Sequence, residues 1–284
     1  MLSLSKIIII KGTKNNGFEQ HAKEKSSIEY KYLKQIIDNN PQYIKRLVNK
    51  NEFCRYSDIR TYNDNKVDIK SKHGYINASW IHIPTLYFFI ATQGPLESTI
   101  EDFWNMCFIY DIKIIIMICK LKENDKEKCA NYWEKYFDRY KIINITEQHY
   151  DGLILRQILI KDMQNWVDKN VLQLQLTTWD DHTASVDNYK RIITMIKFIN
   201  RNKSNSPVVV HCSAGVGRTG TFISIYNLYQ EIMEQINDKS QTQILFSIMN
   251  TVRKLKELRM YSVENEKQYN FLYEFVNLLL KDNN

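Results

Sequence analysis

The stretch PVVVHCSAGVGRTGTF, residues 207–222, decides the fold of this chain. Its apolar start (207–211) is typical of a short buried strand, and the residues from 218 onward follow a helical pattern. Between strand and helix, three of the chain's eight glycines fall within six positions. A strand, a glycine-rich turn and a helix form an anion site, because backbone N–H groups turn inward and the helix N-terminus adds a positive end. The sequence therefore predicts a phosphate-binding loop within an α/β fold.

Two side chains indicate the chemistry of this loop. A thiol at Cys212, close to Arg218 and to a helix N-terminus, is expected to ionise near neutral pH and to act as a nucleophile. Arg218 offers a planar fork that can bind two phosphate oxygens, and Thr219 can donate a hydrogen bond to the thiolate. The nucleotide-binding pattern GxxxxGK[ST] is absent. These residues favour transfer of a phosphoryl group to cysteine.

The segment HCSAGVGRTG (211–220) resembles the signature of cysteine-dependent protein tyrosine phosphatases, and the resemblance extends over about residues 28–280. It implies an α/β fold with a central twisted mixed sheet and helices on both faces. It also implies a phosphocysteine intermediate, with no metal and no cofactor. The implied phosphate-binding residues, in addition to Cys212 and Arg218, are Ser213, Ala214, Gly215, Val216 and Gly217, with His211 as a supporting residue.

Upstream segments resemble the phosphotyrosine-specific members of this family. In CRYSDI (54–59), the resemblance implies that Tyr56 stacks on the substrate ring and that Asp58 holds the peptide backbone. A deep aromatic pocket admits phosphotyrosine and keeps the shorter phosphoserine away from the thiolate. Further similar segments are GYINASWI (74–81), ATQGPL (91–96), DFWNM (102–106) and KCANYW (128–133). In the last region Glu123 would support the arginine, together with Lys128, whereas we interpret Trp104 as a packing residue.

The general acid is expected in TTWDDHTASVD (177–187). The family has a mobile loop reading WPD, and the same spacing here selects Asp181, with Trp179 as the anchor. The proline of that pattern is replaced by Asp180, and the glycine and second proline that usually follow are missing. A second carboxylate next to Asp181 disfavours its ionised form through like-charge repulsion.

A second departure lies in MYSVENEKQYNF (260–271). Where the family has a glutamine that positions the attacking water, this chain has Glu264, while Gln268 can still order water through its amide. A carboxylate charge close to a phosphocysteine is unfavourable in a low dielectric. Hydrolysis of the intermediate could therefore be slow while binding of the substrate is retained.

Three functions are consistent with these patterns. The first is an active protein tyrosine phosphatase that acts on phosphotyrosine-containing proteins. The second is an impaired relative that binds and traps phosphotyrosine sites, which the altered acid loop and Glu264 favour. The third is an RNA 5′-phosphatase, suggested by the net charge of +7. The tyrosine pocket and the lack of a concentrated basic, aromatic strip argue against this third function and against nucleic acid as a partner.

Composition sets the remaining expectations. The 284 residues suit one catalytic domain (21–284) after a flexible N-terminal arm (1–20). Five scattered cysteines favour reduced thiols and a cytoplasmic location. No stretch is apolar enough for a membrane span, so we expect no membrane insertion, and we expect a monomer. The small size and the Ile-, Asn- and Lys-rich composition resemble phosphatases of insect-associated DNA viruses, notably polydnaviruses, which implies host-cell proteins as substrates in the host cytoplasm.

Periodicity predicts the order of the elements. A helix is expected from residue 26, a loop over 49–74, and strands at 85–93, 113–120, 153–160, 171–179 and 207–211. Helices are expected over 189–199, 218–236, 243–258 and 265–281.

Overall fold

A computed structural model describes residues 6–11, 16–49, 52–70, 73–83, 87–180, 186–202 and 204–283. Its main element is an eight-stranded sheet of order β2-β3-β11-β4-β10-β9-β8-β7. In that order the strands are β2 (Ala78–Ile81), β3 (Phe89–Thr92), β11 (Val208–His211), β4 (Ile114–Met117), β10 (Val167–Leu176), β9 (Leu153–Asp162), β8 (Tyr140–Tyr150) and β7 (Lys135–Tyr136).

The centre of the sheet is parallel and its two sides are antiparallel. Strand β11 pairs in parallel with both β3 and β4, with Val209 opposite Ile90 and Ile115. All four residues of each of these three strands are buried. Strands that are buried on both faces read as continuous apolar runs, which is why VVVH and IIIM are recognisable in the sequence. The predicted mixed sheet is confirmed.

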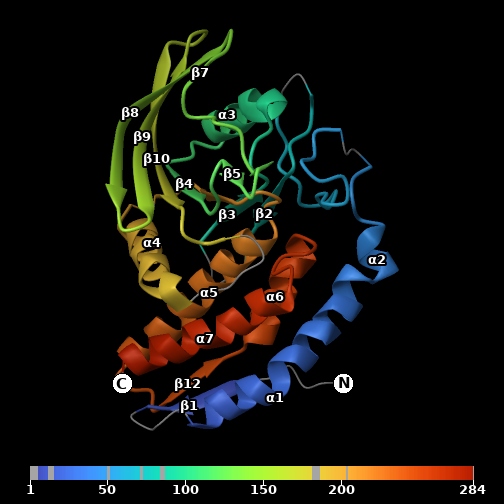
Figure 1. Cartoon of the computed structure of the whole chain (residues 1–284), viewed down its shortest axis with the longest axis vertical. Helices are drawn as coiled ribbons and strands as arrows, with labels where there is room; N and C mark the ends of the chain where they lie inside the picture. Colours follow the sequence, from blue (N-terminus) through green and yellow to red (C-terminus); the bar gives the residue numbers. More distant parts are fainter. Residues whose placement is uncertain are drawn as a thin grey trace.

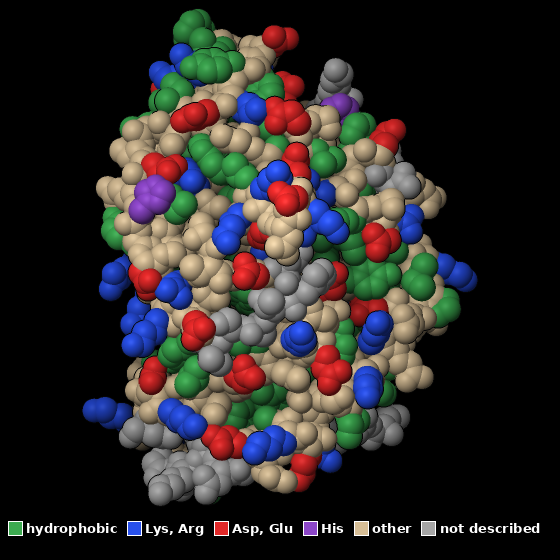
Figure 2. All heavy atoms as spheres, viewed as in Figure 1, with side chains coloured by type: hydrophobic (Ala, Val, Ile, Leu, Met, Phe, Trp, Pro, Cys, Tyr) green, Lys and Arg blue, Asp and Glu red, His purple; other side chains and the backbone are tan. Residues whose placement is uncertain are grey.

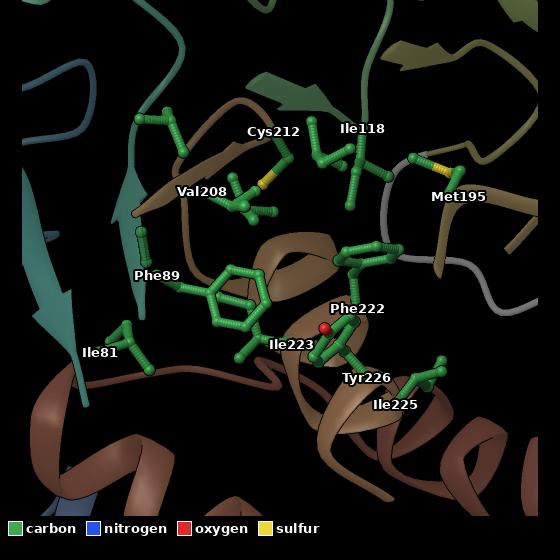
Figure 3. Packing of buried hydrophobic residues seen from close by; sticks show 14 of the residues in the cluster. Ile81, Phe89, Ile118, Met195, Val208, Cys212, Phe222, Ile223, Ile225 and Tyr226 are labelled. Atoms are coloured by element: carbon green, nitrogen blue, oxygen red, sulfur yellow. The ribbon is translucent and has the colours of Figure 1, made fainter. Parts of the chain in front are cut away.

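Helices cover both faces of the sheet (Figure 1). Side chains alternate along a strand, and His211 of β11 lies 6.0 Å, between ring centroids, from Phe103 of α3. Val208, on the opposite face, points toward the core that Phe222 of α5 helps to form (Figure 3). The main helices are α1 (Asn16–Leu33), α3 (Ile100–Ile109), α4 (Tyr189–Asn202), α5 (Gly217–Asn237), α6 (Ile248–Leu258) and α7 (Glu266–Asp282).

Short elements connect these layers. They are the π-helix η1 (Lys34–Asp38), the helix α2 (Pro41–Ile44), the 3-10 helices η2 (Glu97–Thr99) and η3 (Val186–Asn188), and the two-stranded sheet of β5 (Lys122–Glu123) and β6 (Lys126–Glu127). None of the helices in the described ranges is both long and apolar enough to cross a membrane.

A separate two-stranded sheet corrects two predictions from the sequence, which concern the N-terminal arm and the helix over 243–258. Strand β1 (Ile7–Ile10) pairs antiparallel with β12 (Gln243–Phe246), and Ile7 and Ile9 are buried. Residues 7–10 are therefore not a loose arm, because their alternate isoleucines join the core. The predicted helix over 243–258 is wrong at its start: residues 243–246 alternate exposed and buried as a strand, and α6 begins at Ile248 after the N-cap Ser247.

A buried ion pair ties α6 to η1. Lys256 Nζ lies 2.5 Å from Asp38 Oδ2, and the two side chains are 0% and 3% exposed. Burial lowers the pKa of Lys256, and the Asp38 carboxylate acts in the opposite direction. A buried pair contributes little net stability, but removal of one partner leaves an uncompensated charge in the interior.

We expect Lys256→Ala to lower the free energy of unfolding by about 3–5 kcal/mol, because Asp38 is then buried without its cation. The matched control is Lys267→Ala, which removes an exposed lysine and should change stability by less than about 0.5 kcal/mol. Urea denaturation followed by circular dichroism measures both variants. Equal stability of the two variants would contradict the structural role of the pair.

Candidate active site

The loop that the sequence predicts to bind phosphate lies between β11 and α5. Cys212 follows the last residue of the strand and is 3% exposed, and α5 begins at Gly217. Figure 3 shows the Cys212 side chain at the end of β11, close to Ile118. Gly215 has a φ of +73°, and a Cβ at this position would lie 2.1 Å from the carbonyl oxygen of Thr92. Only glycine therefore fits at residue 215.

An arginine that the sequence did not single out holds the outside of the loop. Arg259 Nε donates a hydrogen bond to the carbonyl oxygen of Gly215 at 2.6 Å, and Nη2 donates to that of Ala214 at 3.3 Å. The same guanidinium donates to Asn77 Oδ1 and Ser79 Oγ. Burial lowers the pKa of Arg259 to about 10, with Tyr75, Cys212 and Cys54 acting in the opposite direction. No spacing rule distinguishes this buried arginine from a surface arginine at a helix end.

His211 is fixed by a chain of buried hydrogen bonds. Its Nε2 lies 2.7 Å from the hydroxyl of Tyr132, which accepts a hydrogen bond from Gln173 Nε2. Its Nδ1 lies 3.1 Å from the carbonyl oxygen of Cys212. The backbone is held as well, because Gly94 N donates to the carbonyl oxygen of Ser213 at 2.8 Å. His211, the predicted supporting residue, thus helps to orient the backbone of Cys212, which carries the thiol.

Arg218 is buried at the first turn of α5 and held from two sides. Its Nη1 donates to Glu123 Oε1 at 2.7 Å and to the carbonyl oxygen of Trp179 at 2.8 Å, and Nη2 donates to Glu123 Oε2 at 3.1 Å. This bidentate pair fixes the plane of the guanidinium. The structure brings Glu123, the predicted support of the arginine, to Arg218, and it adds a contact with the carbonyl oxygen of Trp179 that the sequence did not predict. Thr219 Oγ1 is buried and makes no hydrogen bond within the described part of the chain.

A cleft of about 230 Å³ opens over the loop. The predicted pocket residues Tyr56 and Asp58 line it, and the Tyr56 hydroxyl lies 3.0 Å from Ser213 Oγ. The backbone before Tyr56 is anchored by Arg55, whose side chain is 7% exposed and donates to the carbonyl oxygens of Gly94 and Pro95. Lys128 lines the same cleft. The sequence did not identify Arg55 as an anchor, since an arginine next to a pocket residue is equally typical of an exposed loop.

Glu264 and Gln268 lie against the start of α5. A methyl group on Gly217 would stand 2.7 Å from Glu264 Oε2 and 2.8 Å from Gln268 Nε2. Gln268 Oε1 accepts a hydrogen bond from the backbone N of Glu264 at 2.9 Å, which couples the two residues. The sequence assigned Glu264 to the position of the family's water-positioning glutamine, and these distances agree with a position next to the loop.

The predicted acid Asp181 lies outside the described residues. Its neighbour Asp180 is exposed and lies 3.7 Å, between Oδ1 and Nζ, from Lys120. Trp179 is 1% exposed and packs edge-to-face on Phe271 of α7. The anchor at the start of the acid loop is therefore a core residue.

The fold and site together define the class of protein. A parallel central strand leads into a glycine-rich loop that ends in a helix N-terminus, with a thiol at one end of the loop and a clamped guanidinium at the other. A model of the protein-tyrosine phosphatase family matches residues 50–277. The chain belongs to this family.

Known relatives give the extent of the likeness. The chain is 35% identical over 233 residues to human tyrosine-protein phosphatase non-receptor type 20, which covers 78% of this chain and 53% of that protein. It is 34% identical over 218 residues to tyrosine-protein phosphatase 2 of Dictyostelium discoideum, covering 73% and 56%. The chain thus spans about half the length of these curated relatives. A solved structure of PTPN18 matches with a TM-score of 0.78 at 24% identity over 93% of this chain and 98% of that chain, which shows a shared fold.

We expect Gly215→Ala to destabilise the protein well beyond the roughly 1–2 kcal/mol that a left-handed backbone costs an L-residue, because its Cβ would also clash with Thr92. Gly74→Ala is the matched control, since Gly74 has a φ of +60° and open space around its Cβ position. Urea denaturation measures the free energy of unfolding of both variants. The loss in Gly74→Ala reports backbone strain alone, and any additional loss in Gly215→Ala reports the clash. Equal losses for both variants would contradict the close contact between the loop and β3.

Proposed function

We propose that this chain is a protein tyrosine phosphatase that hydrolyses phosphotyrosine on proteins through a phosphocysteine intermediate. The observation that carries the proposal is the fixed guanidinium of Arg218. Glu123 and the carbonyl oxygen of Trp179 hold it in place next to the glycine-rich loop that follows Cys212 in the sequence. A fixed planar fork binds two oxygens of a phosphoryl group and stabilises charge during transfer.

The proposed reaction has two steps. In the first, the Cys212 thiolate attacks phosphorus, the sulfur–phosphorus bond forms, and the bond to the tyrosine oxygen breaks while Asp181 donates a proton to the leaving phenolate. In the second, water attacks phosphorus, Asp181 accepts its proton, and inorganic phosphate leaves with the thiolate regenerated. We propose that Glu264 and Gln268, which lie against the start of α5, order this water.

The residues that line the cleft support phosphotyrosine as the substrate. Tyr56 lines one wall above Ser213, so a flat aromatic ring can stack there while its phosphate reaches the loop. On the face shown in Figure 2, basic and acidic side chains are interspersed, which supports protein substrates over a nucleic acid. A monomer, a cytoplasmic location, a viral origin and host-cell substrates stay predictions from the sequence.

The second candidate function is a trap that binds phosphotyrosine sites and releases them slowly. The observation that favours it is the position of the Glu264 carboxyl group, which lies against the first residue of α5 and lines the same cleft as Cys212. Repulsion there would slow the second step and leave the first unaffected.

Stopped-flow hydrolysis of a phosphotyrosyl peptide tests both functions. We expect the wild type to show a burst of tyrosine product followed by slower turnover, and Glu264→Gln to raise the steady-state rate about tenfold, which corresponds to about 1.4 kcal/mol of relieved repulsion. Cys212→Ser should abolish burst and turnover. A burst with no measurable turnover would favour the trap, and a wild type with neither burst nor turnover would overturn the phosphatase assignment.

The assignment of Asp181 has its own test in the pH dependence of kcat. We expect Asp181→Ala to lower kcat by about 10²–10⁴-fold and to remove the limb of the pH–rate profile that reports the general acid. Asp180→Ala is the matched control and should retain that limb. Unchanged turnover of Asp181→Ala would show that another group protonates the leaving phenolate.

A further inference from the structure

The segment that carries Glu264 has a strained backbone. Tyr261 and Val263 have φ values of 63° and 57°, in the left-handed region that side-chain-bearing residues rarely adopt. A β-branched residue such as Val263 is particularly unfavourable in this conformation, and such strain persists only where surrounding contacts determine it. The segment therefore needs partners outside itself.

Two of these partners come from the N-terminal helical unit of α1 and η1. The hydroxyl of Tyr30 in α1 donates a hydrogen bond to the carbonyl oxygen of Glu264 at 2.5 Å. Asp38, the last residue of η1, accepts a hydrogen bond from the backbone N of Tyr261 at 3.1 Å through the oxygen that does not bind Lys256. Asp38 ends a π-helix, a rare form that is frequent at functional sites.

Tyr30 is suited to this role by its burial. Its side chain is 7% exposed and packs against the ring of Tyr269, with 5.9 Å between centroids. Burial raises the pKa of its hydroxyl, as do the nearby carboxylates of Asp38 and Glu264. The raised pKa favours the protonated hydroxyl, which donates its hydrogen bond to the Glu264 carbonyl oxygen.

We propose that α1 and η1 brace the strained segment, and that Tyr30 is a positioning residue that sets the place of Glu264 in phosphocysteine hydrolysis. This inference rests on the proposed function. Tyr30 touches no reacting atom and acts through the backbone of Glu264, whose side chain lies against Gly217 at the start of α5. The first chemical step, which uses Cys212 and Arg218, does not depend on this contact.

The test is Tyr30→Phe in the full chain, measured by stopped-flow with a phosphotyrosyl peptide. We expect the burst rate to be unchanged and the steady-state rate to fall about 3- to 10-fold, the equivalent of one ordinary hydrogen bond. KM should fall in parallel, because the intermediate accumulates. Tyr32→Phe is the matched control: it lies on the same helix, and its hydroxyl makes no hydrogen bond within the described ranges.

A double-mutant cycle separates positioning from general stability. The effect of Tyr30→Phe should persist in a Glu264→Gln background and disappear in a Glu264→Ala background, where no side chain is left to position. An equal loss in burst and steady-state rates, or a loss that persists with alanine at 264, would overturn the inference. Failure of the proposed function itself would be distinguishable, because the wild type would then release no phosphate.

Discussion

The contact between Arg259 and the carbonyl oxygens of the phosphate loop is the interaction on which the site depends. A loop that binds an anion must turn its N–H groups inward, and its carbonyl groups must then find partners on the outside. A single guanidinium supplies these partners for Gly215 and Ala214 and also binds Asn77 and Ser79 near the edge of the sheet. The anion site and the sheet are thereby joined through one side chain.

Two buried arginines have different roles in the site. Arg259 faces the carbonyl side of the loop and donates hydrogen bonds to neutral oxygens, so its role is to hold the conformation of the loop backbone. Arg218 is paired with the carboxylate of Glu123 and with the carbonyl of Trp179, so its orientation is fixed by partners on two other elements. Because Trp179 also precedes the predicted general acid, the position of this segment, the plane of the Arg218 guanidinium and the packing on Phe271 are coupled.

Much of the fold and site is predictable from the sequence because its signals are local. The run VVVH and the glycines after Cys212 specify strand, loop and helix, and the spacing from Gln268 placed Glu264 beside the loop. Other features depend on contacts between distant segments. Arg259 and Arg55 are structural because of which carbonyl groups surround them, and QILF (243–246) forms a strand because IIII at the N-terminus pairs with it. Local periodicity carries no information about such partners.

The pairing of β1 with β12 has a consequence for synthesis of the chain. Strand β1 can pair with β12 only after residues 243–246 have left the ribosome. Contacts between residues that are far apart in the sequence are slow to form, and an unpaired apolar strand is exposed in the meantime. The alternation of exposed and buried isoleucines in β1, together with Lys6 and Lys11 on either side, keeps this exposed segment short and charged at both ends. Docking of α1 onto α7 and the contact of Tyr30 with Glu264 likewise wait for the synthesis of residues 264–282.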